Sequence, residues 1–99
     1  MSLLLILHFW IGPSAFAGIS PLRERELKNI VEQDCGSCHG LTRKGGLGTP
    51  LLKERMRTFP PEGLKHTILN GIPGTAMPPW RELLNDEEVE WIVHELRGD

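Results

Sequence analysis

The sequence contains no tyrosine and only two cysteines, Cys35 and Cys38. Small exported domains are usually stapled by disulfides, but a bridge between cysteines this close in sequence would close a trivially short loop. No alternation of polar and apolar residues indicates a β-strand, and there is no internal repeat. The 99 residues allow one domain, and residues 18–99, the part expected to remain after export, are near the lower size at which a protein core alone gives useful stability. A cofactor or metal is the better explanation for the cysteine pair.

Long basic runs interleaved with aromatic residues are also missing, which makes nucleic acid a poor candidate partner. Charge is instead divided along the chain. Residues 40–81 carry seven Lys or Arg against two Glu, a net charge of +5. Residues 82–99 carry seven acidic residues against Arg97, a net charge of −6. This division is typical of a molecular dipole that orients a partner, although two solvated helix faces would give the same pattern.

The first seventeen residues contain no charged side chain, and their apolar run over residues 3–11 is too short to span a bilayer comfortably. A Gly-Pro pair then breaks the run, and Ala15-Phe16-Ala17 has the A-x-A pattern of a cleavage site. We therefore expect residues 1–17 to be a signal peptide cleaved after Ala17. Residues 18–99 would then be an exported domain with no stable membrane span. An uncleaved anchor is the alternative, since no Lys or Arg precedes the apolar run.

Helical periodicity predicts an all-α domain whose first helix leads into the cysteines. Ser20 can cap a helix of about fifteen residues, with Pro21 at its first position, where no backbone N–H is needed. Its apolar face is expected to consist of Leu27, Ile30, Val31, Asp34 and Cys38. Residues 40–50 are rich in glycine and have no apolar period, so they are expected to form an irregular loop.

The rest of the chain predicts short helices separated by loops. A helical turn is expected within residues 51–57, and a second helix over residues 61–70 with Gly71 just beyond its end. Residues 72–80 contain three prolines and cannot be regular. The last helix should be capped by Asn85 or Asp86, with Glu88 completing a capping box, and should end at Gly98. Its apolar stripe is expected to be Val89, Ile92, Val93 and Leu96.

Residues 35–39, Cys-Gly-Ser-Cys-His, form a C-x-x-C-H motif, the attachment sequence of c-type haem. Two thiols on one helical turn can each add to a haem vinyl group, and the adjacent His39 then faces the iron. A thioredoxin-type motif would need a βαβ neighbourhood, and a structural zinc site would need a second pair of ligands. The sequence therefore predicts one haem c, attached covalently through Cys35 and Cys38, which also fills the core that the long loops leave open.

Met77 is our candidate for the second axial ligand of the iron. It lies between prolines, which limit the entropy lost when its sulfur is held. A thioether favours Fe(II) and raises the reduction potential. Met56 is expected to be a half-buried helix residue, and His66 and His94 are expected to be structural or solvated helix residues. Ordinary packing of Met77 is the alternative.

Four further residues have open roles. The Pro50 carbonyl, eleven residues after His39, could accept a hydrogen bond from the second imidazole nitrogen, or Pro50 could simply end the loop. Trp80 could close the haem edge, donate to a propionate, or serve packing alone. Arg43 and Lys44 could neutralise propionates, but surface solvation is the simpler expectation for both.

These residues resemble those of the class I c-type cytochromes over essentially all of residues 18–99. The resemblance rests on the helix leading into the C-x-x-C-H motif, on Pro50, on the Gly-x-x-Met-Pro segment of residues 74–78, and on a last helix carrying Trp91. It implies a fold in which the first and last helices cross and pack together, with short helices and long loops wrapped around one haem.

A narrower resemblance is to the NirC-type cytochromes, small periplasmic proteins associated with cytochrome cd nitrite reductase in denitrifying bacteria. It rests on residues 34–40, on the Gly-rich segment of residues 44–48, and on residues 73–80. It implies electron delivery to the nitrite reductase, or a role in maturing its specialised haem. Thr49 departs from the usual Gly-Pro pairing of the family and leaves the role of Pro50 open.

With both axial positions of the iron filled by His39 and Met77, substrate has nowhere to bind. The leading hypothesis is therefore a periplasmic, monomeric carrier of single electrons, not an enzyme, which docks through its basic region onto an acidic surface. Its partners would be redox proteins and the haem-attachment machinery. The alternatives are a haem protein with a labile Met77, which binds ligands or acts like a peroxidase, and a redox-silent module in haem maturation.

Overall fold

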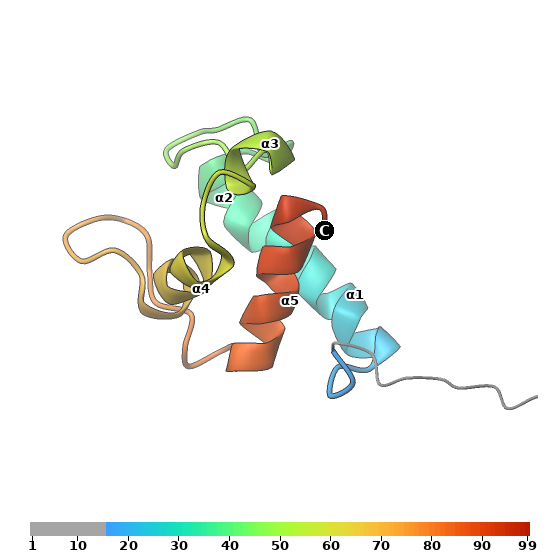
Figure 1. Cartoon of the computed structure of the whole chain (residues 1–99). Coiled ribbons are helices and arrows are strands. Elements are labelled where there is room, and N and C mark those ends of the chain that lie inside the picture. The colour runs from blue at the N-terminus through green and yellow to red at the C-terminus, as the bar shows by residue number, and fades with distance from the viewer. Residues whose placement is uncertain (1–15) are drawn as a thin grey trace, which may run out of the picture.

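The computed structural model describes residues 16–99, and all the regular structure within them is helical. The elements in chain order are α1 (Pro21–Ile30), the π-helical turn η1 (Val31–Cys35), α2 (Gly36–His39), α3 (Lys53–Met56), α4 (Pro61–Asn70) and α5 (Asp86–Arg97). Long irregular segments separate α2 from α3 and α4 from α5 (Figure 1). The prediction of an all-α domain is confirmed.

One continuous helix runs through α1, η1 and α2 to the end of the motif. Ser20 Oγ accepts the N–H of Arg23 at 3.1 Å, and Pro21 takes the first helical position, as predicted. The π turn holds more residues than an α turn, so the side chains beyond it are rotated around the helix axis. Asp34, expected on the apolar face, is therefore exposed, and Cys35 is half-buried in its place.

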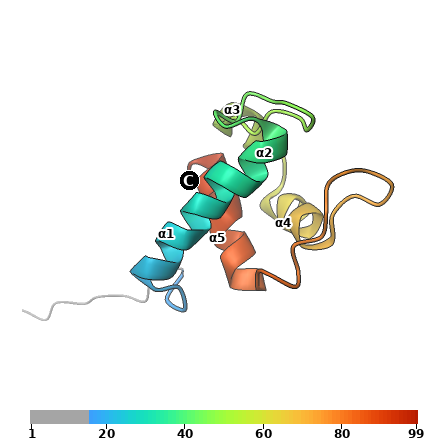
Figure 2. The ribbon, with the colours of Figure 1, turned by 180° about the vertical axis from the view of Figure 1, so that it is seen from behind.

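The last helix, α5, crosses this first helix, as Figures 1 and 2 show from opposite sides. Its predicted capping box is present: Asn85 Oδ1 accepts the N–H of Glu88 at 2.8 Å, and Glu88 Oε1 accepts the N–H of Asn85 at 3.0 Å. Gly98 ends it in the left-handed conformation. The core side chains are Ile19, Leu27, Val31, Met56, Leu69, Leu84, Val89, Ile92, Val93 and Leu96. The expected packing of the first helix on the last is confirmed.

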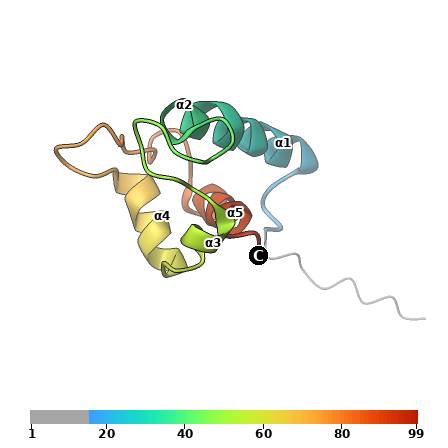
Figure 3. The ribbon, with the colours of Figure 1, turned by 90° about the horizontal axis from the view of Figure 1, so that it is seen from above.

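The short helices α3 and α4 pack against α5 as well, and Figure 3 shows them on one side of it, with the first helix on the other. Met56 of α3 is only 2% exposed. The expectation that it would be half-buried was wrong, because α3 turns this side chain into the core while leaving Arg57 exposed. Leu69 of α4 is buried in the same cluster.

The irregular segments of residues 40–52 and 71–85 leave the helices on the same side of the molecule (Figures 1 and 2). Gly71, the residue after α4, begins the second of them and has a positive φ of 66°. A Cβ at this position would lie 2.6 Å from the Met77 carbonyl oxygen, which only glycine avoids. The N–H of Trp80 then donates to the Ile68 carbonyl at 3.0 Å, which returns the segment to α4.

Most of the expected signal peptide, residues 1–15, lies outside the described residues. The Phe16 ring meets His94 edge-on with 5.4 Å between the ring centroids. The N–H of Gly18, the residue after the expected cleavage site, donates to Glu87 Oε1 of α5 at 3.2 Å. From residue 16 onward, no helix is long and apolar enough to cross a membrane.

An ion pair joins the two crossing helices. The Arg23 guanidinium of α1 bonds the Glu88 carboxylate of α5, whose side chain is 12% exposed. The hydrogen bond from Arg23 holds the pKa of Glu88 below its usual range, since it favours the charged carboxylate. Because the pKa of Glu88 is lowered on folding, the ion pair stabilises the folded protein at pH values above the usual carboxyl pKa. This stability is lost as the pH falls through the lowered pKa.

We predict that Glu88→Gln removes this acid dependence. Glutamine keeps the capping box but not the charge, so at neutral pH the variant should be less stable by about 1 kcal/mol. Its stability should also fall less than that of the native protein between neutral and acid pH. Denaturant unfolding at several pH values measures both effects. Glu26→Gln is the matched control, because Glu26 bonds the same arginine but is 53% exposed. Equal acid sensitivity in Glu88→Gln and the native protein would contradict the assignment.

Candidate haem site

The two cysteines lie on one turn of the first helix, where the π turn passes into α2. Both are free thiols and half-buried. Ser37 Oγ donates to the Asp34 carbonyl at 2.8 Å within this turn. Burial, aided by the charge of Asp34, raises the pKa of the Cys35 thiol to about 11. Redox-active C-x-x-C motifs instead contain a thiol with a lowered pKa, and the Cys35 thiol differs from them in this respect.

His39 is held by the loop that follows it. Its Nδ1 lies 2.6 Å from the Thr49 carbonyl oxygen. A carbonyl only accepts, so Nδ1 carries the proton and Nε2 keeps a free lone pair for a metal. The expectation that the Pro50 carbonyl could be this acceptor was wrong by one residue. The backbone before a proline is extended, which directs the Thr49 carbonyl to the ring, while the Pro50 carbonyl accepts from Arg55 Nη1 at 2.8 Å.

Glycines allow the loop to fold tightly over the histidine. The N–H of Gly45 donates to the His39 carbonyl at 2.9 Å, and the N–H of Gly48 donates to the Cys38 carbonyl at 2.8 Å. A Cβ at Gly48 would lie 2.7 Å from both Nδ1 and Cε1 of His39. The backbone of Gly48 therefore packs directly against the imidazole, and together with the hydrogen bond it fixes the orientation of the ring.

Met77 lies on the separate segment between α4 and α5 and is half-buried. Its N–H donates to Thr75 Oγ1 at 3.3 Å, and this hydroxyl donates to the Ile72 carbonyl at 2.7 Å. Gly74 turns the segment with a φ of 78°. The structure thus brings Cys35, Cys38 and His39 together on one helical segment, while Met77 comes from a second segment on the same side of the molecule (Figure 1).

The other residues that the sequence singled out have structural surroundings. His66 Nδ1 lies 3.1 Å from Asn70 Nδ2 on the same helix, and His94 contacts Phe16. Trp80 is half-buried against the core, in agreement with a packing role. Lys44 is exposed, whereas Arg43 has a left-handed φ of 60°, and its Nη1 is buried with no hydrogen-bond partner in residues 16–99.

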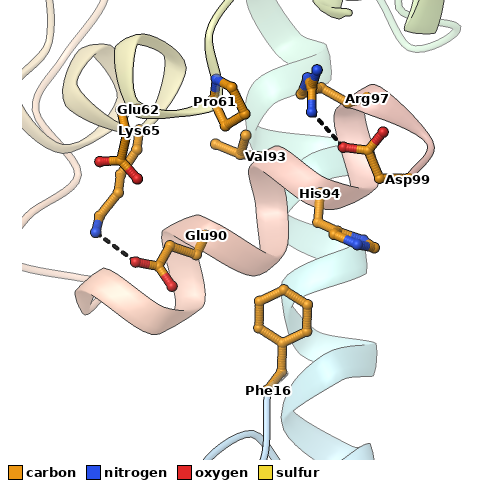
Figure 4. Close-up of a pocket in the computed structure, with 9 residues that line it drawn as sticks. All are labelled: Phe16, Pro61, Glu62, Lys65, Glu90, Val93, His94, Arg97 and Asp99. Carbon is orange, nitrogen blue, oxygen red and sulfur yellow. Dashed lines mark hydrogen bonds and ion pairs between the residues drawn. The ribbon is translucent and has the colours of Figure 1, made fainter. Parts of the chain in front are cut away.

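A pocket between α4 and α5 lies apart from these residues. Figure 4 shows it between the start of α4 and the second half of α5, with the His94 and Phe16 side chains at one edge. Lys65 of α4 donates to Glu90 of α5 across it at 2.7 Å. No residue of the C-x-x-C-H motif or of the Met77 segment lines it, so it is not part of the candidate site.

The donor set fits haem c. Two half-buried thiols on one turn and an imidazole with Nε2 free are the groups that thioether attachment and axial ligation require. A structural zinc site would need more ligands, and residues 16–99 contain no group of three His, Cys, Asp or Glu side chains placed to hold a metal ion. These observations define the class of protein as a c-type cytochrome.

Comparison with known proteins identifies the family. The family described as cytochrome C oxidase, cbb3-type, subunit III matches residues 23–94. Cytochrome c55X of Paracoccus denitrificans is 44% identical over 97 residues, which cover 97% of this chain and 91% of the relative. A solved structure of the c-type cytochrome NirC has a TM-score of 0.77 at 44% identity and covers 80% of this chain and 93% of that one. The chain belongs to the class I c-type cytochromes and is of the NirC type.

A more distant relative is much larger. The dihydro-heme d1 dehydrogenase of Pseudomonas aeruginosa is 33% identical over 89 residues, which cover 90% of this chain but only 17% of the relative. A solved structure titled dihydro-heme d1 dehydrogenase NirN in complex with DHE has a TM-score of 0.65 at 33% identity, over 71% of this chain and 15% of that chain. The likeness is therefore confined to a cytochrome-sized part of that enzyme.

Sequence reasoning missed two residues around His39. The glycine content predicted an irregular loop, but it did not predict that Gly48 packs against the His39 ring. The spacing from His39 suggested the Pro50 carbonyl as the hydrogen-bond acceptor, whereas the acceptor is the Thr49 carbonyl. The available signal was the Thr-Pro pair itself, because the residue before a proline is extended and its carbonyl direction is restricted.

We predict that Gly48→Ala destabilises the holoprotein by about 1–3 kcal/mol, the usual cost of overpacking, because the new methyl group displaces the imidazole from the Thr49 carbonyl. Thermal unfolding followed at the haem absorption band measures the effect. Gly63→Ala is the matched control, since a Cβ there has open space in α4 and should be neutral or stabilising. Equal melting temperatures of the Gly48→Ala and native proteins would argue against tight packing of Gly48 on the ring.

Proposed function

We propose that this chain is a periplasmic monohaem carrier of single electrons that works with, or around, the dissimilatory nitrite reductase of denitrification. Cys35 and Cys38 attach one haem c, and His39 and Met77 are its axial ligands. The observation that carries the proposal is the His39 imidazole, oriented by Thr49 and Gly48 with Nε2 free, one residue after the second thiol. The likeness to NirC supports the link to nitrite reduction.

The chain's own residues would act by holding the two axial positions and excluding other ligands. The haem supplies the one-electron change of its iron between Fe(II) and Fe(III). The Thr49 carbonyl fixes the protonated Nδ1 of His39, and the anchors at Gly71 and Thr75 limit the freedom of the Met77 segment. We propose a carrier rather than an enzyme, because with His39 and Met77 holding the iron a substrate would have no position at which to bind it.

Export and cleavage after Ala17 are part of the proposal, since a short apolar run precedes the A-x-A pattern of residues 15–17. Gly18 would then be the amino terminus of the mature protein, residues 18–99. Its nitrogen already lies 3.2 Å from Glu87 Oε1. The new ammonium group would meet a carboxylate in the first turn of α5, so cleavage would replace a hydrogen bond with an ion pair.

The partner surface follows from the charge pattern. The +5 region, residues 40–81, contains residues 40–52 and most of the Met77 segment, which lie on one side of the molecule, and Arg43 and Lys44 belong to the first of these segments. An acidic surface on the partner would be attracted to this side and would bring its own redox centre near the haem. The acidic residues of the last helix would repel the same partner surface, so docking through that helix would be disfavoured.

A labile Met77 is the second candidate, in a haem protein that binds ligands or helps to mature the haem of the nitrite reductase. It is favoured by the likeness to dihydro-heme d1 dehydrogenase and by the exposed segment around Met77, where Ile72 is 48% exposed. Such a segment could release the sulfur and open one face of the iron. Carbon monoxide distinguishes the two candidates, because it binds ferrous haem only at an open position.

We predict that Met77→Ala abolishes the weak long-wavelength sulfur–iron band of the oxidised holoprotein and lets the reduced form bind carbon monoxide. The native protein should be low-spin and unchanged by carbon monoxide. Visible spectra of protein exported together with haem-attachment machinery provide the measurement. Met56→Leu is the control, since this buried methionine tolerates a volume-conserving change and should keep the band. A high-spin native spectrum, or ready carbon monoxide binding, would favour the labile-ligand candidate.

We also predict that electron exchange with an acidic redox partner slows as ionic strength rises, because salt screens the attraction that orients the encounter. Lys44→Glu should reduce the rate severalfold at low ionic strength. Lys28→Glu, on the exposed face of α1 and outside the +5 region, should change it little. Stopped-flow kinetics measures both. A rate that ionic strength leaves unaffected would count against docking through the basic region.

A further inference from the structure

Arg55 lies next to the His39–Thr49 contact and bonds the same short segment. Its Nη1 donates to the Pro50 carbonyl at 2.8 Å and lies 3.4 Å from Thr49 Oγ1. The guanidinium also sits over the Phe59 ring, 5.2 Å from its centroid. The side chain is half-buried, so these contacts are partly shielded from water. Arg55 is thus fixed from two directions.

The geometry of the Thr49–Pro50 pair transmits this hold to the histidine. The peptide bond between the two residues is planar, and the proline ring fixes its own φ, so only the ψ of Pro50 lets the two carbonyl groups turn relative to each other. One of them accepts from Arg55, and the other accepts from His39 Nδ1. On the other side of Thr49, the N–H of Gly48 donates to the Cys38 carbonyl at 2.8 Å, so the Thr49 carbonyl is held from both of its neighbours.

We propose that Arg55 is a positioning residue, which holds the Thr49 carbonyl against His39 and thereby sets the donor strength of the axial imidazole and the reduction potential of the iron. The inference rests on the proposed function, in which His39 is an axial ligand. A strong Nδ1–H···O=C bond makes the imidazole a better electron donor, which favours Fe(III) and lowers the potential. Loosening the Thr49–Pro50 segment should therefore raise it.

The positive charge of Arg55 acts in the opposite direction. A cation near the haem favours Fe(II), so deleting the charge alone would lower the potential. A variant that keeps the charge and removes the planar, two-contact geometry separates the two effects. Arg55→Lys does this, because an ammonium group on a flexible stem cannot reproduce the fork of a guanidinium or its stacking on Phe59.

The experiment compares holoproteins carrying Arg55→Lys and Arg57→Lys. Arg57 is the matched control, since it caps the end of the same short helix but donates to the Arg97 and Gly98 carbonyls at 2.7 and 3.2 Å, away from the loop. The readouts are the reduction potential and the solvent exchange of the His39 Nδ1 proton, followed by NMR in the reduced state. In Arg55→Lys we expect a raised potential and roughly tenfold faster exchange, the factor for about 1.4 kcal/mol. In Arg57→Lys both should match the native protein.

Unchanged potential and exchange in Arg55→Lys would overturn the proposal, even if the variant melts at a lower temperature, because a purely structural role predicts that result. If Arg55→Lys fails to fold with haem, Phe59→Leu decides, since Phe59 is 40% exposed and its loss frees the guanidinium. Faster exchange of the His39 Nδ1 proton in Phe59→Leu supports the proposal, and exchange at the rate of the native protein rejects it. A native protein without an iron-bound His39 ring signal would instead refute the proposed function, before any variant is compared.

Discussion

The hydrogen bond between His39 Nδ1 and the Thr49 carbonyl is the interaction on which the candidate site depends. It assigns the proton to one ring nitrogen and leaves the other with a free lone pair, and it ties the end of the first helix to the glycine-rich loop. Within the loop, the N–H of Leu51 also donates to the Arg43 carbonyl at 2.9 Å. Its shape follows from the bonds that return to Cys38 and His39, and from Arg55, which holds the residue after Thr49.

The helices provide the fixed frame for this contact. α5 crosses the first helix, and the Arg23–Glu88 pair joins them beside the buried Leu27 and Val89. The end of the first helix therefore carries the C-x-x-C-H turn at a defined place, while α4 anchors the segment that bears Met77. A small domain can leave long segments irregular when a large apolar cofactor lies between them and supplies contacts that side chains do not.

Much of the fold could be predicted from the sequence, because caps and apolar periods are local signals. The Ser20 cap, the Asn85–Glu88 capping box and the helix over residues 61–70 agree with the structure. The π turn before Cys35 could not be predicted, since no proline or glycine marks it, and it placed Asp34 outside the expected face. At the site, the motif located both thiols and His39. The acceptor on Thr49 and the role of Gly48 depend on tertiary contacts, which spacing alone does not contain.

The central claim is that one iron is held between His39 and Met77 in both redox states, and X-ray absorption at the iron edge of the exported holoprotein tests it most directly. The account predicts six-coordinate iron with five nitrogen neighbours and one sulfur neighbour in the oxidised protein and again in the reduced protein. Loss of the sulfur neighbour in either state, or its replacement by nitrogen or oxygen, would contradict a closed electron carrier.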